Sequence, residues 1–231
     1  MPLESALRLT EILLALTFVQ QGLEHMRRPA AERLLLGLRL VLALLLLGGF
    51  YTQWICLALV VLALCILHRF QGPYNGGSDR IGLLTLCCLT LAHFLPNQEL
   101  KEYAFGYLAL QLVLSYFVSG WVKIVNREWR QGTALRDVFL FSTYPVSERT
   151  RGWVNHPKLL WVMSWAVMLF EIFFPLSLVS HVSLYIGLAI AALFHLANAL
   201  LFGLNRFFWA WLAAYPSIIW FQARFFDGVL G

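Results

Sequence analysis

Four polar side chains recur at every fourth residue of one long apolar stretch, and the last of them is an amine. They are Gln111, Ser115, Ser119 and Lys123. This spacing places them along one face of a helix. Because desolvation favours the neutral amine, a lysine at the edge of an apolar bundle can take up a proton. The pattern also suits a structural role, in which Ser and Gln join helices and the lysine extends to the lipid boundary.

Two further apolar stretches contain side chains of this kind. Glu171 lies within "MLFEIFFPL", and His195 and Asn198 lie three residues apart in "LFHLANALLF". A charge inside a membrane costs about 2.5–3.5 kcal/mol and therefore faces the bundle interior with a partner. The partners available to Glu171 are Arg39, Lys123 and a histidine, and an Arg39–Glu171 ion pair is the structural alternative to a reactive site.

The elements that position these residues are predicted to be transmembrane helices. The chain of 231 residues is 60% hydrophobic and 13% charged, whereas about a quarter of the residues of a soluble domain are charged. We predict an all-α, polytopic transmembrane bundle of about eight helical segments, at residues 4–24, 34–49, 51–67, 81–95, 103–124, 158–180, 182–204 and 207–226. The first carries Arg8, Glu11, Gln20 and Gln21, so it either crosses the membrane or lies at its surface.

The whole chain, residues 1–231, is predicted to form one transmembrane domain. Its longest loop, residues 125–157, contains "TALRDVFLF", which is typical of a short interfacial helix. If all eight segments cross, 13 Lys and Arg residues fall on one side of the membrane and 3 on the other. This asymmetry predicts that loop 125–157 is cytoplasmic in a bacterial inner membrane.

Several classes of site are not indicated by the sequence. No metal-ligand spacing and no nucleotide-binding glycine motif is present, so we expect no metal site. The basic residues lie in loops between apolar runs, which is a topology pattern, so we expect no nucleic-acid partner.

A family resemblance rests on segments in the same order along the chain. The stretch "YFVSGWVKIVNREWRQGTAL" and the stretch "FHLANALLFGLNRFFWAWLAAYP" resemble segments of the vitamin K-dependent γ-carboxylases and their bacterial relatives, the HTTM (horizontally transferred transmembrane) domain proteins. "FEIFFPL" and "NGGSD" resemble two more. The residues that carry the first two are Tyr116, Phe117, Ser119, Gly120, Lys123, Trp129, Gly132, Phe194, His195, Gly203, Phe207 and Phe208.

The resemblance implies a chemistry. In the carboxylases a lysine helps to deprotonate a hydroquinone, which reacts with oxygen, and the strong base so formed removes a γ-proton from a glutamate that then takes up carbon dioxide. Lys123 matches that lysine, and His195 matches a histidine that we expect to position the quinone oxygen. We predict Lys123, His195 and Glu171 as catalytic residues of a quinone-dependent carboxylase, epoxidase-like enzyme or oxidoreductase. The predicted cofactor is a reduced quinone, vitamin K-like or menaquinone-like, with contacts from Tyr116, Ser119, Trp121 and Asn198.

Two departures from the carboxylases shape the expected substrate. Those enzymes carry a large extramembrane domain for a secreted protein substrate, whereas this chain ends at Gly231, and the charge pattern places the Lys123 loop in the cytoplasm. We therefore expect a small peptide or a lipid-soluble substrate, with the lipid bilayer and a lipid-soluble small molecule as partners. The alternative is a non-catalytic partner of a redox protein or a carrier, in which Lys123 extends to water.

Overall fold

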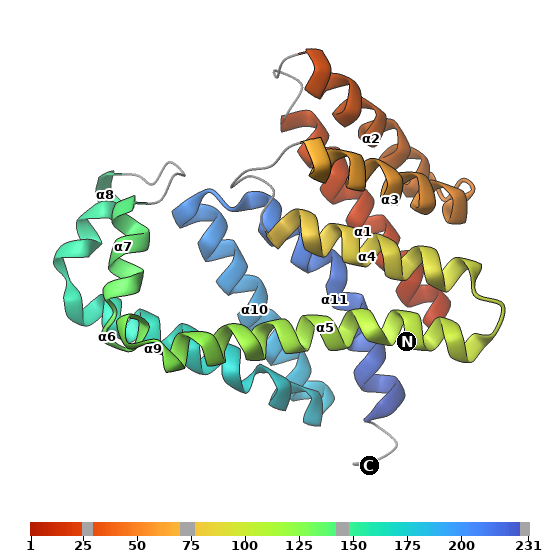
Figure 1. Ribbon diagram of the computed structural model, residues 1–231. Helices are drawn as coiled ribbons and strands as arrows, with labels where there is room; N and C mark the ends of the chain where they lie inside the picture. Colours follow the sequence, from red (N-terminus) through yellow and green to blue (C-terminus); the bar gives the residue numbers. More distant parts are fainter. Residues whose placement is uncertain (25–29, 70–76, 142–147, 227–231) are drawn as a thin grey trace. The chain divides into compact units, whose positions relative to one another are not determined.

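The chain is helical throughout the part that its structure describes. The structure is a computed structural model that describes residues 1–24, 30–69, 77–141 and 148–226, and within these residues it contains helices and no strand (Figure 1). The predicted all-α fold class is confirmed. The elements in chain order are α1 (Leu3–Glu24), α2 (Ala30–Gly48), α3 (Thr52–Arg69), α4 (Gly77–Phe94), α5 (Gln98–Val125), α6 (Arg127–Gln131), α7 (Thr133–Phe141), α8 (Glu148–Arg151), η2 (Gly152–Asn155), α9 (Pro157–Phe173), η3 (Phe174–Val179), α10 (His181–Phe202) and α11 (Asn205–Phe225).

Three of the described segments are long and apolar enough to cross a membrane. They are Gln98–Val125, Pro157–Val179 and His181–Phe202, and two shorter apolar helices cover Leu34–Gly48 and Thr52–His68. The protein is therefore an integral membrane protein by the length and composition of its helices. That the remaining predicted segments also cross stays a prediction.

The helices gather into two compact units. The first unit comprises Met1–Leu110 and Trp209–Ala223, and the second comprises Gln111–Phe208 and Arg224–Gly231. Helices α5 and α11 contribute residues to both units. That the chain acts as one domain stays a prediction, and the two units are described separately below.

In the first unit, consecutive helices pack against one another. Helix α1 packs against α2, α2 against α3, and α3 against α4 (Figure 1). Its core is made of large apolar side chains that are almost completely buried, such as Leu14, Leu46, Leu59, Leu86 and Leu108. Buried threonines such as Thr10 and Thr85 donate to the carbonyl one turn earlier, so their hydroxyls are satisfied within their own helices.

A charged cluster joins three helices of the first unit. Glu11, which is only 2% exposed, accepts from Arg8 at 2.8 Å through one carboxylate oxygen and lies 2.6 Å from Nε2 of His93 through the other. The guanidinium of Arg8 also donates to the carbonyls of Leu46 and Leu47 at the end of α2. Arg8 therefore caps α2 while it neutralises a carboxylate that would otherwise be costly to bury.

In the second unit, α9 changes to a 3₁₀ helix where a proline follows. Pro175 has no amide hydrogen, so the α-helical bond to the carbonyl of Glu171 cannot form, and the chain continues as η3. The segment predicted as one helix over residues 158–180 is therefore α9 followed by η3. Ser180 then caps α10 by a reciprocal pair of hydrogen bonds with Ser183, and Gly203, at φ 70°, ends it.

The loop between α5 and α9 has its own helices and a small core. Helix α7 is the "TALRDVFLF" segment, and it buries Leu135 and Phe139 against Leu160 and Phe202, with Trp153 packed beside them. This core fixes the loop to α9 and to the end of α10. Its position at the membrane surface stays a prediction.

Candidate functional site

An ion pair between α5 and α9 is the first component of the site. Nζ of Lys123 donates to both carboxylate oxygens of Glu171, at 2.7 Å and 2.6 Å. The Lys123 side chain is 18% exposed and that of Glu171 is 5% exposed. Of the partners that the sequence left open for Glu171, the structure selects Lys123. Arg39, the alternative, lies 3.9 Å from Asp79 and over the ring of Phe18 in the first unit.

Gly120 allows α5 and α9 to approach closely enough for this pair. A Cβ atom at Gly120 would lie 2.6 Å from the backbone nitrogen of Ile172 and 3.0 Å from Cβ of Glu171. Real side chains do not tolerate such distances, so the two backbones are in contact only because residue 120 is glycine. Lys123 follows one turn later on the same face and thereby reaches the carboxylate.

The short helix α6 covers the amine of Lys123. The Trp129 ring centre lies 5.4 Å from Nζ of Lys123, within the range of a cation–π contact. Two side chains of α9 hold α6 in place, because Ser164 Oγ donates to the carbonyl of Trp129 at 2.5 Å and Trp165 Nε1 donates to that of Arg130 at 3.1 Å. The indole of Trp129 therefore lies over the amine while α9 supports the backbone behind it.

The turns on each side of α6 are fixed by local chemistry. Arg130 donates to the carbonyls of Ile124 and Val125, which are among the unpaired carbonyls at the end of α5. Gly132 ends α6 at φ 77°, and a Cβ there would lie 2.9 Å from the backbone nitrogen of Trp161. The path from Lys123 to α7 is therefore determined by a few short-range contacts.

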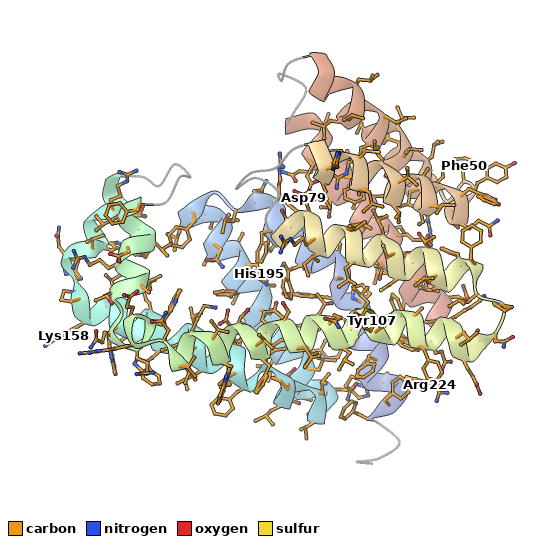
Figure 2. The ribbon with its side chains drawn as sticks, viewed as in Figure 1. Phe50, Asp79, Tyr107, Lys158, His195 and Arg224 are labelled. Atoms are coloured by element: carbon orange, nitrogen blue, oxygen red, sulfur yellow. The ribbon has the colours of Figure 1, made fainter. Side chains whose placement is uncertain are left out.

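A buried hydrogen bond between α5 and α10 is the second component. The hydroxyl of Tyr116 lies 2.7 Å from Nε2 of His195, and each of these residues is 2% exposed. His195 belongs to α10 (Figure 2). A buried hydroxyl and imidazole satisfy one another here, which offsets the cost of placing both in an apolar interior.

Aromatic rings surround this hydrogen bond. The Tyr116 ring lies 4.2 Å from that of Phe174 and 5.6 Å from that of Phe170, measured between centroids. His195 lies 5.1 Å from both Phe194 and Phe207. Tilted and edge-on packing of this kind holds the polar atoms in place among apolar rings.

The two components lie on one side of α5. Tyr116 and Lys123 are seven residues apart, which is about 10 Å along the axis and nearly two full turns. Glu171, the partner of Lys123, adjoins Phe170, which packs on Tyr116. The structure therefore brings Tyr116, Lys123, Glu171 and His195 into one unit as two hydrogen-bonded pairs. The buried side of α5 passes through Tyr116 and Gly120, and the seam of Ser115 and Ser119 beside it is only half-buried.

The other predicted cofactor contacts lie at the margin. Ser119 and Asn198 are half-buried and Trp121 is 54% exposed. Within the described residues, none of these three side chains hydrogen-bonds to either pair. Their role in ligand binding stays a prediction.

Sequence reasoning missed three features of this architecture. The rings of Phe170 and Phe174 were counted as part of an apolar span, although the aromatic pattern beside Glu171 was visible. Trp129 is a residue of the family resemblance, but its place over the Lys123 amine is not predicted by the sequence. The Arg8–Glu11–His93 cluster of the first unit was not foreseen, although Glu11 and His93 both stand out in apolar runs.

One known family matches the part of the chain that contains this site. A family model described as "HTTM domain" matches residues 90–223, which is more than half of the chain and includes both hydrogen-bonded pairs. No curated protein and no solved structure matches the chain.

Proposed function

Because this chain is a membrane protein of the HTTM domain family, which is vitamin K-dependent carboxylase-like, we propose that its second unit contains a proton-transfer site for a reduced quinone. The observation that carries the proposal is the Lys123–Glu171 pair, in which both carboxylate oxygens accept from one amine in a largely apolar setting. The reaction would be oxygen-linked proton abstraction from, or carboxylation of, a small substrate.

The residues present suit a reduced quinone, vitamin K-like or menaquinone-like. Such a ligand is a flat apolar ring with two oxygens, and the site offers aromatic faces together with a hydroxyl, an imidazole and an amine. A reduced quinone supplies an acidic ring hydroxyl and reducing equivalents for reaction with oxygen. Tyr116 and His195 would hold one ring oxygen, and Ser119, Trp121 and Asn198 would contact the rest of the ligand.

Lys123 would act as the base, and Glu171 would accept the proton that the Lys123 ammonium gives up beforehand. In a setting of low polarity an ammonium–carboxylate pair is costly, and moving one proton from Nζ to a carboxylate oxygen gives a neutral pair. Nζ then has a lone pair and can take a proton from a ligand hydroxyl. The Trp129 ring would shield one side of the amine from water during this exchange.

The compartment forms part of the proposal. The 13 to 3 distribution of Lys and Arg supports a bacterial inner membrane with loop 125–157 in the cytoplasm. A small peptide, a lipid-soluble molecule or a redox partner protein would then reach the site from that side or from the bilayer.

A second candidate is a non-catalytic carrier of a lipid-soluble molecule or partner of a redox protein. The observation that favours it is that each of the four polar side chains already has a partner within the unit. Satisfied buried pairs also specify a single packed structure without any chemistry.

Lipid analysis and turnover distinguish the two candidates. The purified protein is expected to retain a quinone detectable by mass spectrometry of its lipid extract, and to consume oxygen when supplied with menaquinol. Lys123→Met should lower that rate by about 10²–10⁴-fold, the usual contribution of a general base, whereas Lys101→Met at the start of α5 should not. A retained quinone without any turnover in the wild-type protein would favour the carrier, and absence of both would refute the proposal.

A further inference from the structure

Two adjoining clefts lie at the start of α9, away from the proposed proton-transfer site. One has a volume of about 600 Å³ and is lined by Trp153, Asn155, His156, Pro157, Lys158 and Leu159. The other, of about 470 Å³, is lined by Gln131, Pro157, Lys158, Trp161 and Val162. They share Pro157 and Lys158, so one elongated ligand could occupy both.

The first cleft has the chemistry of an anion site. It contains the exposed ammonium of Lys158, which Figure 2 shows at the outer edge of the ribbon, and it also contains His156 and the amide of Asn155. His156 precedes α9 and makes no side-chain cap, so it does not occupy the amide hydrogens of the first turn, which point away from the helix. A cation and the positive end of a helix dipole therefore meet at one position.

The second cleft is mainly apolar. Trp161 is 49% exposed and Val162 is 55% exposed, and they follow the shared Lys158 by about one turn of α9. An exposed indole and an aliphatic side chain next to a cation are suited to an amphiphile at the membrane interface. The second cleft therefore extends the anion site with a surface for a hydrocarbon chain.

The local charge favours an anionic ligand over a zwitterionic one. Between residues 125 and 158 the sequence has six Lys and Arg residues and three Asp and Glu residues. Basic segments close to a membrane attract anionic lipids. The ligand class that combines an anionic headgroup with a hydrocarbon chain is an anionic phospholipid.

We propose that these two clefts bind one anionic glycerophospholipid, with its phosphate at Lys158 and the start of α9 and an acyl chain along Trp161 and Val162. The site is separate from the Lys123–Glu171 pair and requires no catalysis. It would anchor the N-terminal end of α9, the helix that carries Glu171, to one membrane leaflet.

Native mass spectrometry of the purified full chain tests this proposal. Dioleoyl phosphatidylglycerol should bind in preference to dioleoyl phosphatidylcholine, and Lys158→Gln should lower phosphatidylglycerol affinity about fivefold, as expected for one lysine near an anionic headgroup. Lys101→Gln, the matched control, should leave it unchanged. His156→Gln provides a second variant of the same cleft and should also weaken binding.

Two further arms separate a whole lipid from a phosphate group alone. Trp161→Gln should weaken phosphatidylglycerol binding, and millimolar inorganic phosphate should not displace the lipid. The proposal is overturned if Lys158→Gln and Lys101→Gln behave alike, if phosphatidylcholine binds equally well, or if inorganic phosphate competes fully.

Discussion

At the scale of single residues, the Lys123–Glu171 pair determines the electrostatics of the second unit. Each member is costly to bury alone and tolerable only beside the other. Because both carboxylate oxygens face one amine, removal of either member leaves a charge or a proton donor without its partner. The stability of the pair is therefore a property of the two residues together.

A double-mutant cycle measures that coupling. Glu171→Leu and Lys123→Met are each expected to lower the free energy of unfolding by about 3 kcal/mol, because each leaves an uncompensated group in an apolar setting. The double variant should recover to within about 1 kcal/mol of the wild type, since both charges are then gone. Unfolding in mixed micelles gives the four values, and simple additivity of the single effects would contradict the pairing.

The Tyr116 hydroxyl offers a second test at this scale. Tyr116→Phe keeps the ring that packs on Phe174 but removes the hydroxyl that bonds to His195, so we expect a loss of about 1 kcal/mol in unfolding free energy. Tyr107→Phe is the matched control, because Tyr107 lies on the same helix and is 52% exposed (Figure 2). Equal effects of the two substitutions would show that the buried hydrogen bond contributes nothing.

At the scale of elements, the contact between α5 and α9 depends on a missing side chain. Gly120→Ala should push the two backbones apart and lower the unfolding free energy by about 1–3 kcal/mol, as overpacking does. It should also reduce any Lys123-dependent activity, because Nζ is moved from the carboxylate. Gly37→Ala in α2 is the control, since a Cβ there has no atom within 4 Å and helix propensity alone should make it neutral or stabilising. Both effects are read from unfolding curves and from the oxygen-consumption assay.

Much of the element order could be predicted from the sequence, and the pairing of elements could not. Continuous apolar runs and the breakers Pro96 and Gly203 locate the helices to within a few residues. Both signals are properties of the local sequence, so they can be seen without knowledge of the tertiary structure. The sequence does not decide which residue pairs with Glu171, because Arg39 and Lys123 are both cations that could form the ion pair. The choice depends on the rotation of α9 and on the close approach at Gly120, which are tertiary properties.

The catalytic and cofactor residues could likewise be proposed from the sequence, whereas their contacts with one another could not. The family could be recognised from the segments around Lys123 and His195, and the family match confirms it. The packing of Phe170 and Phe174 on Tyr116 is a contact between α5 and the segment from α9 to η3. Helix periodicity places the two rings on one face, but it does not tell which side chain of another helix that face meets.

At the scale of the whole molecule, α5 is longer than the hydrocarbon core of a membrane is thick. Its 28 residues span about 42 Å, whereas the hydrocarbon core is about 30 Å. The polar start of α5, "QELKEY", therefore extends beyond the core, or the helix tilts. A membrane-spanning α5 is therefore expected to have its two ends on opposite faces of the membrane.

Accessibility labelling tests the orientation of the chain. In a variant whose four native cysteines are replaced, Asn97→Cys should react with a membrane-impermeant maleimide in intact bacterial cells, because few basic residues lie on that side. Arg127→Cys, at the other end of α5, should react only after the membrane is opened. The reverse pattern would move loop 125–157 out of the cytoplasm and would remove the support for a cytoplasmic substrate.

The distance in sequence between the two members of the ion pair has a consequence for how the protein is made. Lys123 precedes Glu171 by 48 residues, whereas Arg130 reaches the end of α5 from only six residues away. At a synthesis rate of roughly 10 residues per second, the ribosome adds Lys123 to the chain about five seconds before it adds Glu171. Until α9 is made, Arg130 can already pair with the carbonyls at the end of α5, whereas Lys123 has no carboxylate partner. Burial of the Lys123 amine is therefore expected to follow the synthesis of α9, the helix that supplies its carboxylate.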